Sequence, residues 1–354
     1  MIYGQGSLWE DTLVFIEEDF NGRALLQTLF SYDLVTGVKK KILDLPDSRH
    51  VSGPPSVYGN RVIWSSADQK EYMRAMLSSR LPTPLNLDVF CLDLTNGQIE
   101  QITSEPHGQK SPAIYGDAIV WIDDRNSDET RFPQSHDVYA YNLKAKTETR
   151  LTASPTVEGY TDQLSLAGNL VVWSDNRNAD AGNLNRPSNL ASYNNEIYSY
   201  DLTTHQERRI TSSPLNDQLP VVDQNRVVWL RLEDFQKADV FAFDLNTGRE
   251  NQVSQSHFAA FAPAMSGDWV AWVDARISRG NTTADLVING VRGGAEIYLS
   301  SLKTGTETRI TNAYPDNSDL NIVWGQPVLS RDYLVFTSLF QVGTTTFAVR
   351  LPRE

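Results

Sequence analysis

Short apolar runs alternate with polar turns along the whole chain, and several of these runs end on a tryptophan and pass directly into charged residues. Examples are IVWIDDRN at 119–126, LVVWSDNRN at 170–178 and VAWVDARI at 270–277. The runs alternate with period two and are rich in β-branched and aromatic residues, which is typical of strands rather than helices. Their recurrence predicts an internal repeat.

The aromatic residue that ends each run marks the repeat. It occurs at intervals of roughly 50 residues, close to the length of one propeller blade. The positions are Phe15, Trp64, Trp121, Trp173, Trp229, Trp272 and Phe336. A proline stands before most of these positions, and each is followed by a run such as DVYAYNL (137–143), a turn such as TNG or KTG, and a run such as RLT or RIT. Each unit therefore reads as four strands, a to d, with the aromatic near the end of strand b.

Seven such units predict an all-β fold, a seven-bladed β-propeller of four-stranded antiparallel blades. We expect one domain over residues 1–354. The blades are expected at 6–46, 55–104, 112–153, 164–212, 220–254, 263–311 and 327–354. The last unit ends without a strand d, so either the seventh blade has three strands or its fourth strand lies upstream of this sequence. We expect the aromatic residues to fill the space between neighbouring blades.

The charged residues after the aromatic lie where strand b leaves the sheet, and strand c then opens with an acid. In an antiparallel hairpin the arginine at the end of b lies beside that acid, which predicts cross-strand ion pairs. The predicted pairs are Arg125–Asp137, Arg177–Glu196 and Arg276–Glu296. The alternative is a cation held by DNRNAD at 175–180. Calcium loops prefer carboxylates at alternate positions, and Arg177 occupies one of them, so we expect no metal here and no cofactor.

Composition excludes several classes of protein. Hydrophobic residues make up 40% of the chain, which is enough for a core. The net charge of −13 disfavours nucleic acid and anionic membranes as partners. Cys91 is the single cysteine, so internal disulfides are excluded. No signal peptide and no apolar run long enough to insert into a membrane are visible.

The repeat resembles that of TolB-type β-propellers, in the version found in tandem in microbial periplasmic and cell-surface proteins. The match is carried by YGDAIVWIDDRN (115–126), AGNLVVWSDNRN (167–178) and SGDWVAWVDARI (266–277), followed by runs such as EIYSYDL (196–202) and by E-x-[RQ]-[IL]-T. The second and fifth units lack the Asp-x-Arg element. The resemblance implies an extracytoplasmic binding or scaffolding module, here expected as a monomer with a protein or glycan partner.

The connections between strands b and c and between strands d and a are long, whereas the other turns are minimal. Elaborate loops on a rigid frame usually carry binding, so we expect a ligand at this face and at the central channel. The residues counted there are His107, Lys110, Tyr160, Asp162, Gln163, Asp217, Gln218, Phe261 and Gln326. A solvated channel mouth without a ligand is the alternative. The 66–81 segment reads as a short helix, with Met73 and Leu77 on one side, that covers its own blade.

Catalytic motifs are not visible. The chain has no G-x-S-x-G and no H-E-x-x-H, and its five histidines are scattered. The sequence therefore favours a non-catalytic binding module. The alternative is a carbohydrate-active enzyme, a lyase or glycosidase, that uses Asp162 and Asp217 as paired carboxylates.

Overall fold

The structure, a computed structural model, describes most of the chain. The described residues are 6–20, 25–46, 48–77, 85–127, 135–152, 156–157, 164–178, 194–234, 237–254, 260–276, 295–312, 323–340 and 343–352. Contacts divide the chain into two compact units, Met1–Asn169 and Leu170–Glu354. The expectation of a single domain stays a prediction.

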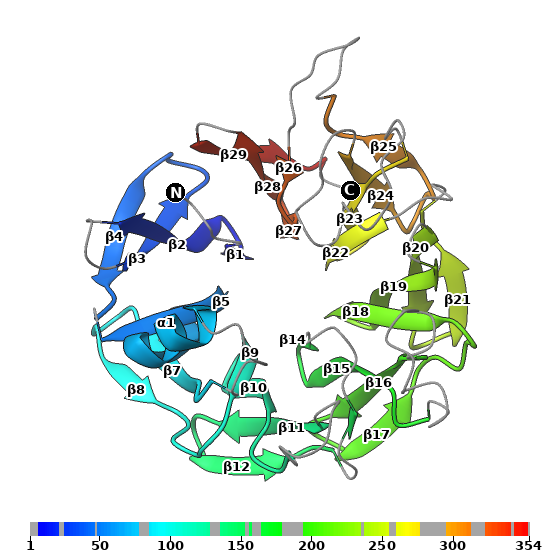
Figure 1. The fold of residues 1–354 in the computed structure, drawn as a ribbon. Helices are drawn as coiled ribbons and strands as arrows, with labels where there is room; N and C mark the ends of the chain where they lie inside the picture. Colours follow the sequence, from blue (N-terminus) through cyan, green and yellow to red (C-terminus); the bar gives the residue numbers. More distant parts are fainter. Residues whose placement is uncertain are drawn as a thin grey trace. The chain divides into compact units, whose positions relative to one another are not determined.

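In the first unit, each sheet is built from strands that follow one another along the chain (Figure 1). The first sheet contains β1 (Ser7–Trp9), β2 (Thr12–Phe20), β3 (Leu25–Asp33) and β4 (Lys39–Asp44). The second contains β5 (Arg49–Tyr58), β6 (Arg61–Asp68), β7 (Asp88–Asp93) and β8 (Ile99–Gln101). The third contains β9 (Gln109–Tyr115), β10 (Ala118–Asp123), β11 (Ser135–Asn142) and β12 (Thr147–Arg150), with β13 (Thr156–Val157) beside β11.

The second unit continues the same order. The unit boundary falls within the fourth sheet, which contains β14 (Leu164–Ala167), β15 (Leu170–Asp175), β16 (Glu196–Asp201) and β17 (Gln206–Arg209). The fifth sheet contains β18 (Asn216–Asp223), β19 (Arg226–Asp234), β20 (Lys237–Asp244) and β21 (Arg249–Gln252). The sixth contains β22 (Ala260–Ser266), β23 (Trp269–Asp274), β24 (Glu296–Ser301) and β25 (Glu307–Arg309).

The seventh sheet is different. β26 (Val323–Trp324) and β27 (Val328–Leu329) pair with opposite halves of β28 (Tyr333–Phe340), whose full length also pairs with β29 (Gly343–Arg350). The two short strands are therefore one interrupted strand a, and the described residues of this blade form three strands. The fold is a seven-bladed β-propeller of antiparallel blades, which confirms the predicted class.

The aromatic residue of strand b stacks on an aromatic of strand c in each of the seven sheets. Trp121, fully buried, lies opposite Tyr139, with their ring centroids 6.1 Å apart. The same pairing occurs in Phe15–Phe30, Trp64–Phe90, Trp173–Tyr198, Trp229–Phe241, Trp272–Tyr298 and Phe336–Phe347. Trp121 also shares a buried cluster with Ile63 and Val89 of the preceding sheet, so it fills the space between blades as expected.

The short turns between strands c and d are held by the last polar residue of strand c. In the second sheet, the Asp93 carboxylate accepts a hydrogen bond from the Thr95 backbone N–H (2.8 Å). Gly97 closes this turn with a φ of 74°, a conformation that favours glycine. This geometry explains the recurrent TNG and KTG signals.

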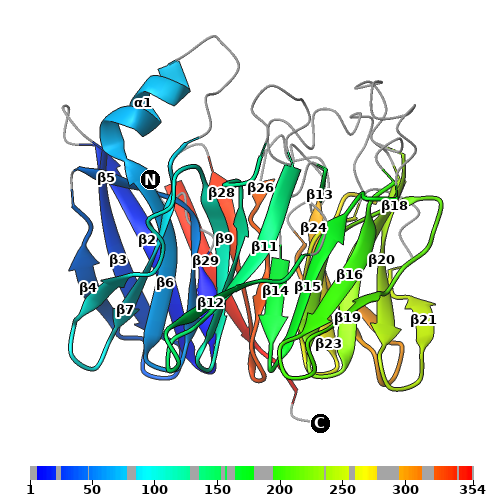
Figure 2. The same cartoon turned by 90° about the horizontal axis from the view of Figure 1, so that it is seen from below.

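Helix α1 (Gln69–Leu77) follows β6 and lies against the second sheet, at one end of its strands (Figure 2). Asp68 caps the helix, because its carboxylate accepts hydrogen bonds from the backbone N–H groups of Lys70 and Glu71. Tyr72 stacks on buried His50 of β5, with ring centroids 3.5 Å apart. The helix thus covers its own blade, but through Tyr72 and not through Met73, whose side chain is exposed.

The burial of His50 predicts a pH dependence of stability. Burial lowers the pKa of His50 from 6.5 to about 4. The unfolded chain therefore binds this proton at a higher pH than the folded chain, and the free energy of unfolding should fall between pH 6.5 and 4, by up to about 3 kcal/mol. Urea unfolding over this range should show a weaker pH dependence in His50→Phe, which keeps an aromatic ring against Tyr72. An equally steep dependence in the variant would rule out His50 as its source.

Candidate functional site

Asp123, the last residue of β10, is the centre of a buried hydrogen-bond network in the third sheet. Its carboxylate accepts hydrogen bonds from the Trp121 indole N–H (2.8 Å) and from the Arg125 backbone N–H (2.9 Å). The Arg125 guanidinium adds two more, at 2.6 and 2.9 Å. The spacing of Trp, Asp and Arg therefore lets one carboxylate accept hydrogen bonds both from the indole N–H and from the arginine in the turn after the strand.

Arg125 also connects strand b to strands c and d. Its guanidinium carbon lies 4.3 Å from the centroid of the Tyr139 ring, and Nη1 donates to Glu148 of β12 (2.8 Å). Burial alone would lower the pKa of Arg125, but the hydrogen bonds that it donates to Asp123 and Glu148 outweigh burial and raise the pKa. The arginine is therefore a permanent cation between two carboxylates.

Two other sheets repeat this network. The equivalent residues are Trp173, Asp175, Arg177, Tyr198 and Glu207 in the fourth sheet and Trp272, Asp274, Arg276, Tyr298 and Glu307 in the sixth. These are the three units in which the sequence contains W-x-D-x-R.

The acids that open strand c have other partners than those predicted. Asp137 accepts hydrogen bonds from Arg150 and Thr152 of the strand d region, both at 2.8 Å. Glu196 pairs with Arg209, and Glu296 pairs with Arg309. The predicted pairs Arg125–Asp137, Arg177–Glu196 and Arg276–Glu296 are therefore wrong.

The cross-strand register explains this arrangement. Asp123 lies directly opposite Asp137, so two carboxylates face each other and each needs its own cation. The turn after β10 folds Arg125 back onto Asp123, and the second cation comes from strand d. The sequence carried a signal for this in E-x-R-[IL]-T, because residues two apart on a strand share a face.

The fifth sheet lacks Asp-x-Arg, and its arginine binds an acid on strand a. Arg231 stands two residues after Trp229, directly opposite Asp217 of β18, and binds it through two hydrogen bonds of 2.7 and 3.0 Å. Arg231 also donates to Glu250 and lies over the Phe241 ring. Asp217 is fully buried, and burial raises its pKa while Arg231 acts in the opposite direction.

This pairing changes the interpretation of Asp217. Both of its carboxylate oxygens accept hydrogen bonds from Arg231. Asp217 therefore stabilises the sheet and is not available to bind a ligand or to act as a general base. Asp162, its proposed catalytic partner, lies outside the described residues.

The expectation that no cation binds the Asp-x-Arg loops stays a prediction. Its physical basis is that the Asp175 carboxylate accepts hydrogen bonds from Trp173 and Arg177, which leaves little room for a metal. Thermal melts with and without a chelator should superimpose. A chelator-induced fall of several degrees in Tm would contradict this.

The recurring proline of strand a marks a strained β-bulge. Ser111, Leu219 and Ala262, each directly before a proline, have φ values of 49°, 55° and 48°. The pairing of strands a and b shifts register at each of these points. Positive φ is unfavourable for residues other than glycine, and such strain and bulges are concentrated near functional sites.

Relief of this strain should stabilise the protein. Ala262→Gly is expected to raise the free energy of unfolding by up to about 1 kcal/mol, because glycine adopts positive φ without strain. Chemical denaturation should be compared with Ala264→Gly in the same strand, whose φ is ordinary and whose methyl is buried. That control should be destabilised. Equal losses in both variants would show that position 262 is not strained.

The described members of the predicted ligand set lie at the bulged end of the a strands, within their own units. Lys110, Gln218 and Phe261 are strand residues at or beside the bulges, not loop residues as expected, because the a strands begin before the proline. His107 and Gln326 are half-buried. Tyr160, Asp162 and Gln163 lie outside the described residues.

A buried charged cluster in the third sheet was missed by the sequence reasoning. Asp124 is buried between the His136 ring, whose Nδ1 it contacts, and the Lys110 ammonium at 3.0 Å. Burial would raise the pKa of Asp124, but His136 and Lys110 outweigh it and lower the pKa. His107, with φ 76°, precedes this cluster. The sequence separates these residues, so they appear as scattered singletons.

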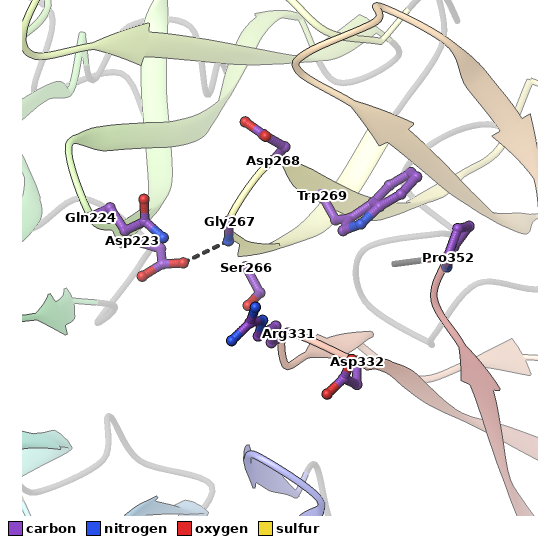
Figure 3. A pocket seen from close by; sticks show the side chains of 9 residues that line it. All are labelled: Asp223, Gln224, Ser266, Gly267, Asp268, Trp269, Arg331, Asp332 and Pro352. Atoms are coloured by element: carbon purple, nitrogen blue, oxygen red, sulfur yellow. Dashed lines mark hydrogen bonds between the residues drawn. The ribbon is translucent and has the colours of Figure 1, made fainter. Parts of the chain in front are cut away.

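A cavity in the second unit lies at the opposite end of the a strands. It is formed by the a–b turns of the fifth, sixth and seventh sheets, with Asp223, Trp269 and Arg331 in its lining (Figure 3). β18 begins at Asn216 near the predicted ligand residues and ends at Asp223 in this cavity. The cavity was not predicted, because short turns carry no sequence signal for a pocket.

Comparison with known proteins supports the fold. No family model and no curated protein matches the chain by sequence. The β-propeller domain of the Trilobed protease from Pyrococcus furiosus, with an open velcro topology, is similar at TM-score 0.63 and 8% identity, over 99% of this chain and 98% of that one. A putative TolB from Agrobacterium tumefaciens is similar at TM-score 0.50 and 12% identity, over 92% and 98%. The chain has the TolB-type β-propeller fold.

An acylaminoacyl peptidase from Pyrococcus horikoshii is also similar, at TM-score 0.61 and 10% identity, over 96% of this chain and 49% of that one. Identities this low show the fold alone, and this TolB-type fold occurs with different activities. In this chain the described strands of the first sheet all come from the N-terminal part of the sequence, and those of the last sheet all come from the C-terminal part. Among the described residues no helix is long and apolar enough to span a membrane.

Proposed function

We propose that this TolB-type propeller is a non-catalytic binding module that holds a protein or glycan partner at the bulged end of its a strands. The observation that supports it is the repeated strain before Pro112, Pro220 and Pro263. A strained backbone lowers stability, and its repetition at one end of three sheets is better explained by the side chains that it positions than by packing.

The residues proposed to contact a partner are His107 and Lys110 in the first unit and Gln218, Phe261 and Gln326 in the second, together with Tyr160, Asp162 and Gln163, which stand outside the described residues. Amides, an imidazole and aromatic rings suit a polar, uncharged ligand such as a glycan or a peptide backbone. Asp217 is not included, because Arg231 binds both its oxygens.

Binding rather than catalysis is supported by the state of the buried carboxylates. Asp123, Asp175, Asp217 and Asp274 each accept hydrogen bonds from an arginine of the same sheet. General acid–base catalysis needs a carboxyl that exchanges its proton with a substrate. These four carboxylates are held by arginines within their sheets, so they are not placed to exchange a proton with a substrate. By resemblance to TolB-type proteins, the module is proposed to act outside the cytoplasm as a monomer.

A glycan and peptide array probed with the purified protein tests this proposal. Hits should be lost in Gln326→Ala and His107→Asn, with little change in Tm, because both side chains are only half-buried. Asn246→Ala, in an exposed c–d turn, is the matched control and should keep them. Hits that survive both variants and disappear in the control would place the partner at the other end of the strands.

A further inference from the structure

The cavity at the a–b turns has the size of a small-molecule site. Its volume is about 710 Å³, within the range of ligand pockets. Three successive sheets of the second unit contribute to it, through Asp223 at the end of β18, Ser266 to Trp269 between β22 and β23, and Arg331 before β28 (Figure 3). Because tight turns hold these residues, the cavity is largely preformed.

The charges that line the cavity are not equally satisfied. Asp223 accepts a hydrogen bond from the Gly267 backbone N–H (2.6 Å), Asp268 pairs with Arg226, and Asp332 is a third acid in the lining. Arg331 differs, because its exposed guanidinium makes no hydrogen bond or ion pair with any residue in the described part of the chain. Within the described ranges, the cavity therefore contains a cation without a partner of its own.

The other walls limit which anion fits. Trp269 belongs to the cavity lining and is half-buried against the core of the last two sheets, and in Figure 3 its ring lies on the side of Pro352, away from Asp223. Asp223 and Asp268 retain lone pairs that accept hydrogen bonds from hydroxyl or ammonium groups. These carboxylates and the net charge of −13 disfavour a multiply charged phosphate.

We propose that this cavity is a second binding site, for a small carboxylate whose body carries hydroxyl or ammonium donors. Arg331 binds the carboxylate through its paired N–H groups, as the planar guanidinium fits two oxygens. Asp223 and Asp268 accept hydrogen bonds from the hydroxyl or ammonium donors of the ligand. A sugar acid and the end of a peptide both carry this chemistry.

Isothermal titration calorimetry with defined probes tests the site. D-glucuronate represents a sugar acid, with glucose as its neutral control, and triglycine represents a peptide end, with triglycine amide as its control. At least one carboxylate should bind while its control, which lacks the carboxylate, does not, and the one that binds identifies the source. Inorganic phosphate is titrated in parallel.

Variants then assign the binding to Arg331. Arg331→Gln should weaken binding about tenfold or more, because a hydrogen bond between charged groups is lost. Arg249→Gln is the matched control, since Arg249 is also exposed and lacks a partner among the described residues but lies on β21, outside the cavity lining. Both variants should unfold like the wild type.

Three results would overturn this proposal: no heat with either carboxylate, equal affinity in Arg331→Gln, or tighter binding of phosphate than of both carboxylates. Its failure would leave the proposed function untouched, because the array experiment uses residues at the other end of the strands.

Discussion

Arg231→Ala is expected to lower the free energy of unfolding by about 3–5 kcal/mol, because it leaves a buried charge without its partner. Asp217 is fully buried and receives two hydrogen bonds from this guanidinium. The substitution also removes the stacking of Arg231 on Phe241. Equilibrium unfolding in urea, at a pH where Asp217 is ionised in the unfolded chain, measures the effect.

Two further variants separate the charge from the side chain. Arg249→Ala, at an exposed position of the same sheet, should change the free energy of unfolding by less than about 0.5 kcal/mol. Arg231→Gln combined with Asp217→Asn should recover part of the loss, since no buried charge remains. A single variant as stable as the wild type would show that Asp217 is solvated or protonated in the folded protein.

Asp123→Ala is expected to cost a similar amount, about 3–5 kcal/mol, because it breaks a buried charge pair and leaves the indole N–H of Trp121 unsatisfied. Trp121 is fully buried, and Glu148 would be the one charged partner left to Arg125 in the part of the chain that the structure describes. Tryptophan fluorescence should follow the same unfolding transition, since Trp121 lies in the network.

Asp117→Ala is the control for this prediction. Asp117 pairs with Arg61, but both side chains are substantially exposed, so the loss should stay below about 1 kcal/mol. If the two aspartates cost the same, the Trp121–Asp123–Arg125 network is not a stabilising unit.

These networks show why W-x-D-x-R recurs in only some blades. In the third, fourth and sixth sheets the carboxylate comes from the end of strand b, whereas in the fifth it comes from strand a as Asp217. In all four sheets an arginine lies over the aromatic ring of strand c. The arginine over the ring is thus the shared element, and the position of its acid varies.

The sequence by itself determined the strands, the repeat and the fold class. Alternation with period two is a local property, so the sequence shows it directly. An aromatic residue at nearly constant spacing indicates seven similar sheets, each packed through the same bulky side chain. A three-stranded last blade was one of the two alternatives that the sequence left open, because AVRLPRE offers neither the turn nor the final run of the other units.

Only the tertiary structure decided the partners of the charges and the location of the cavity. Arg125 and Asp137 are close in sequence, but the register that sets Asp123 opposite Asp137 determines which arginine binds which acid. The bulge at Leu219 converts expected loop residues into strand residues. Arg331 and Asp223 meet in one cavity although a hundred residues separate them, because three sheets place their turns together. Such contacts depend on long-range packing, which no local pattern encodes.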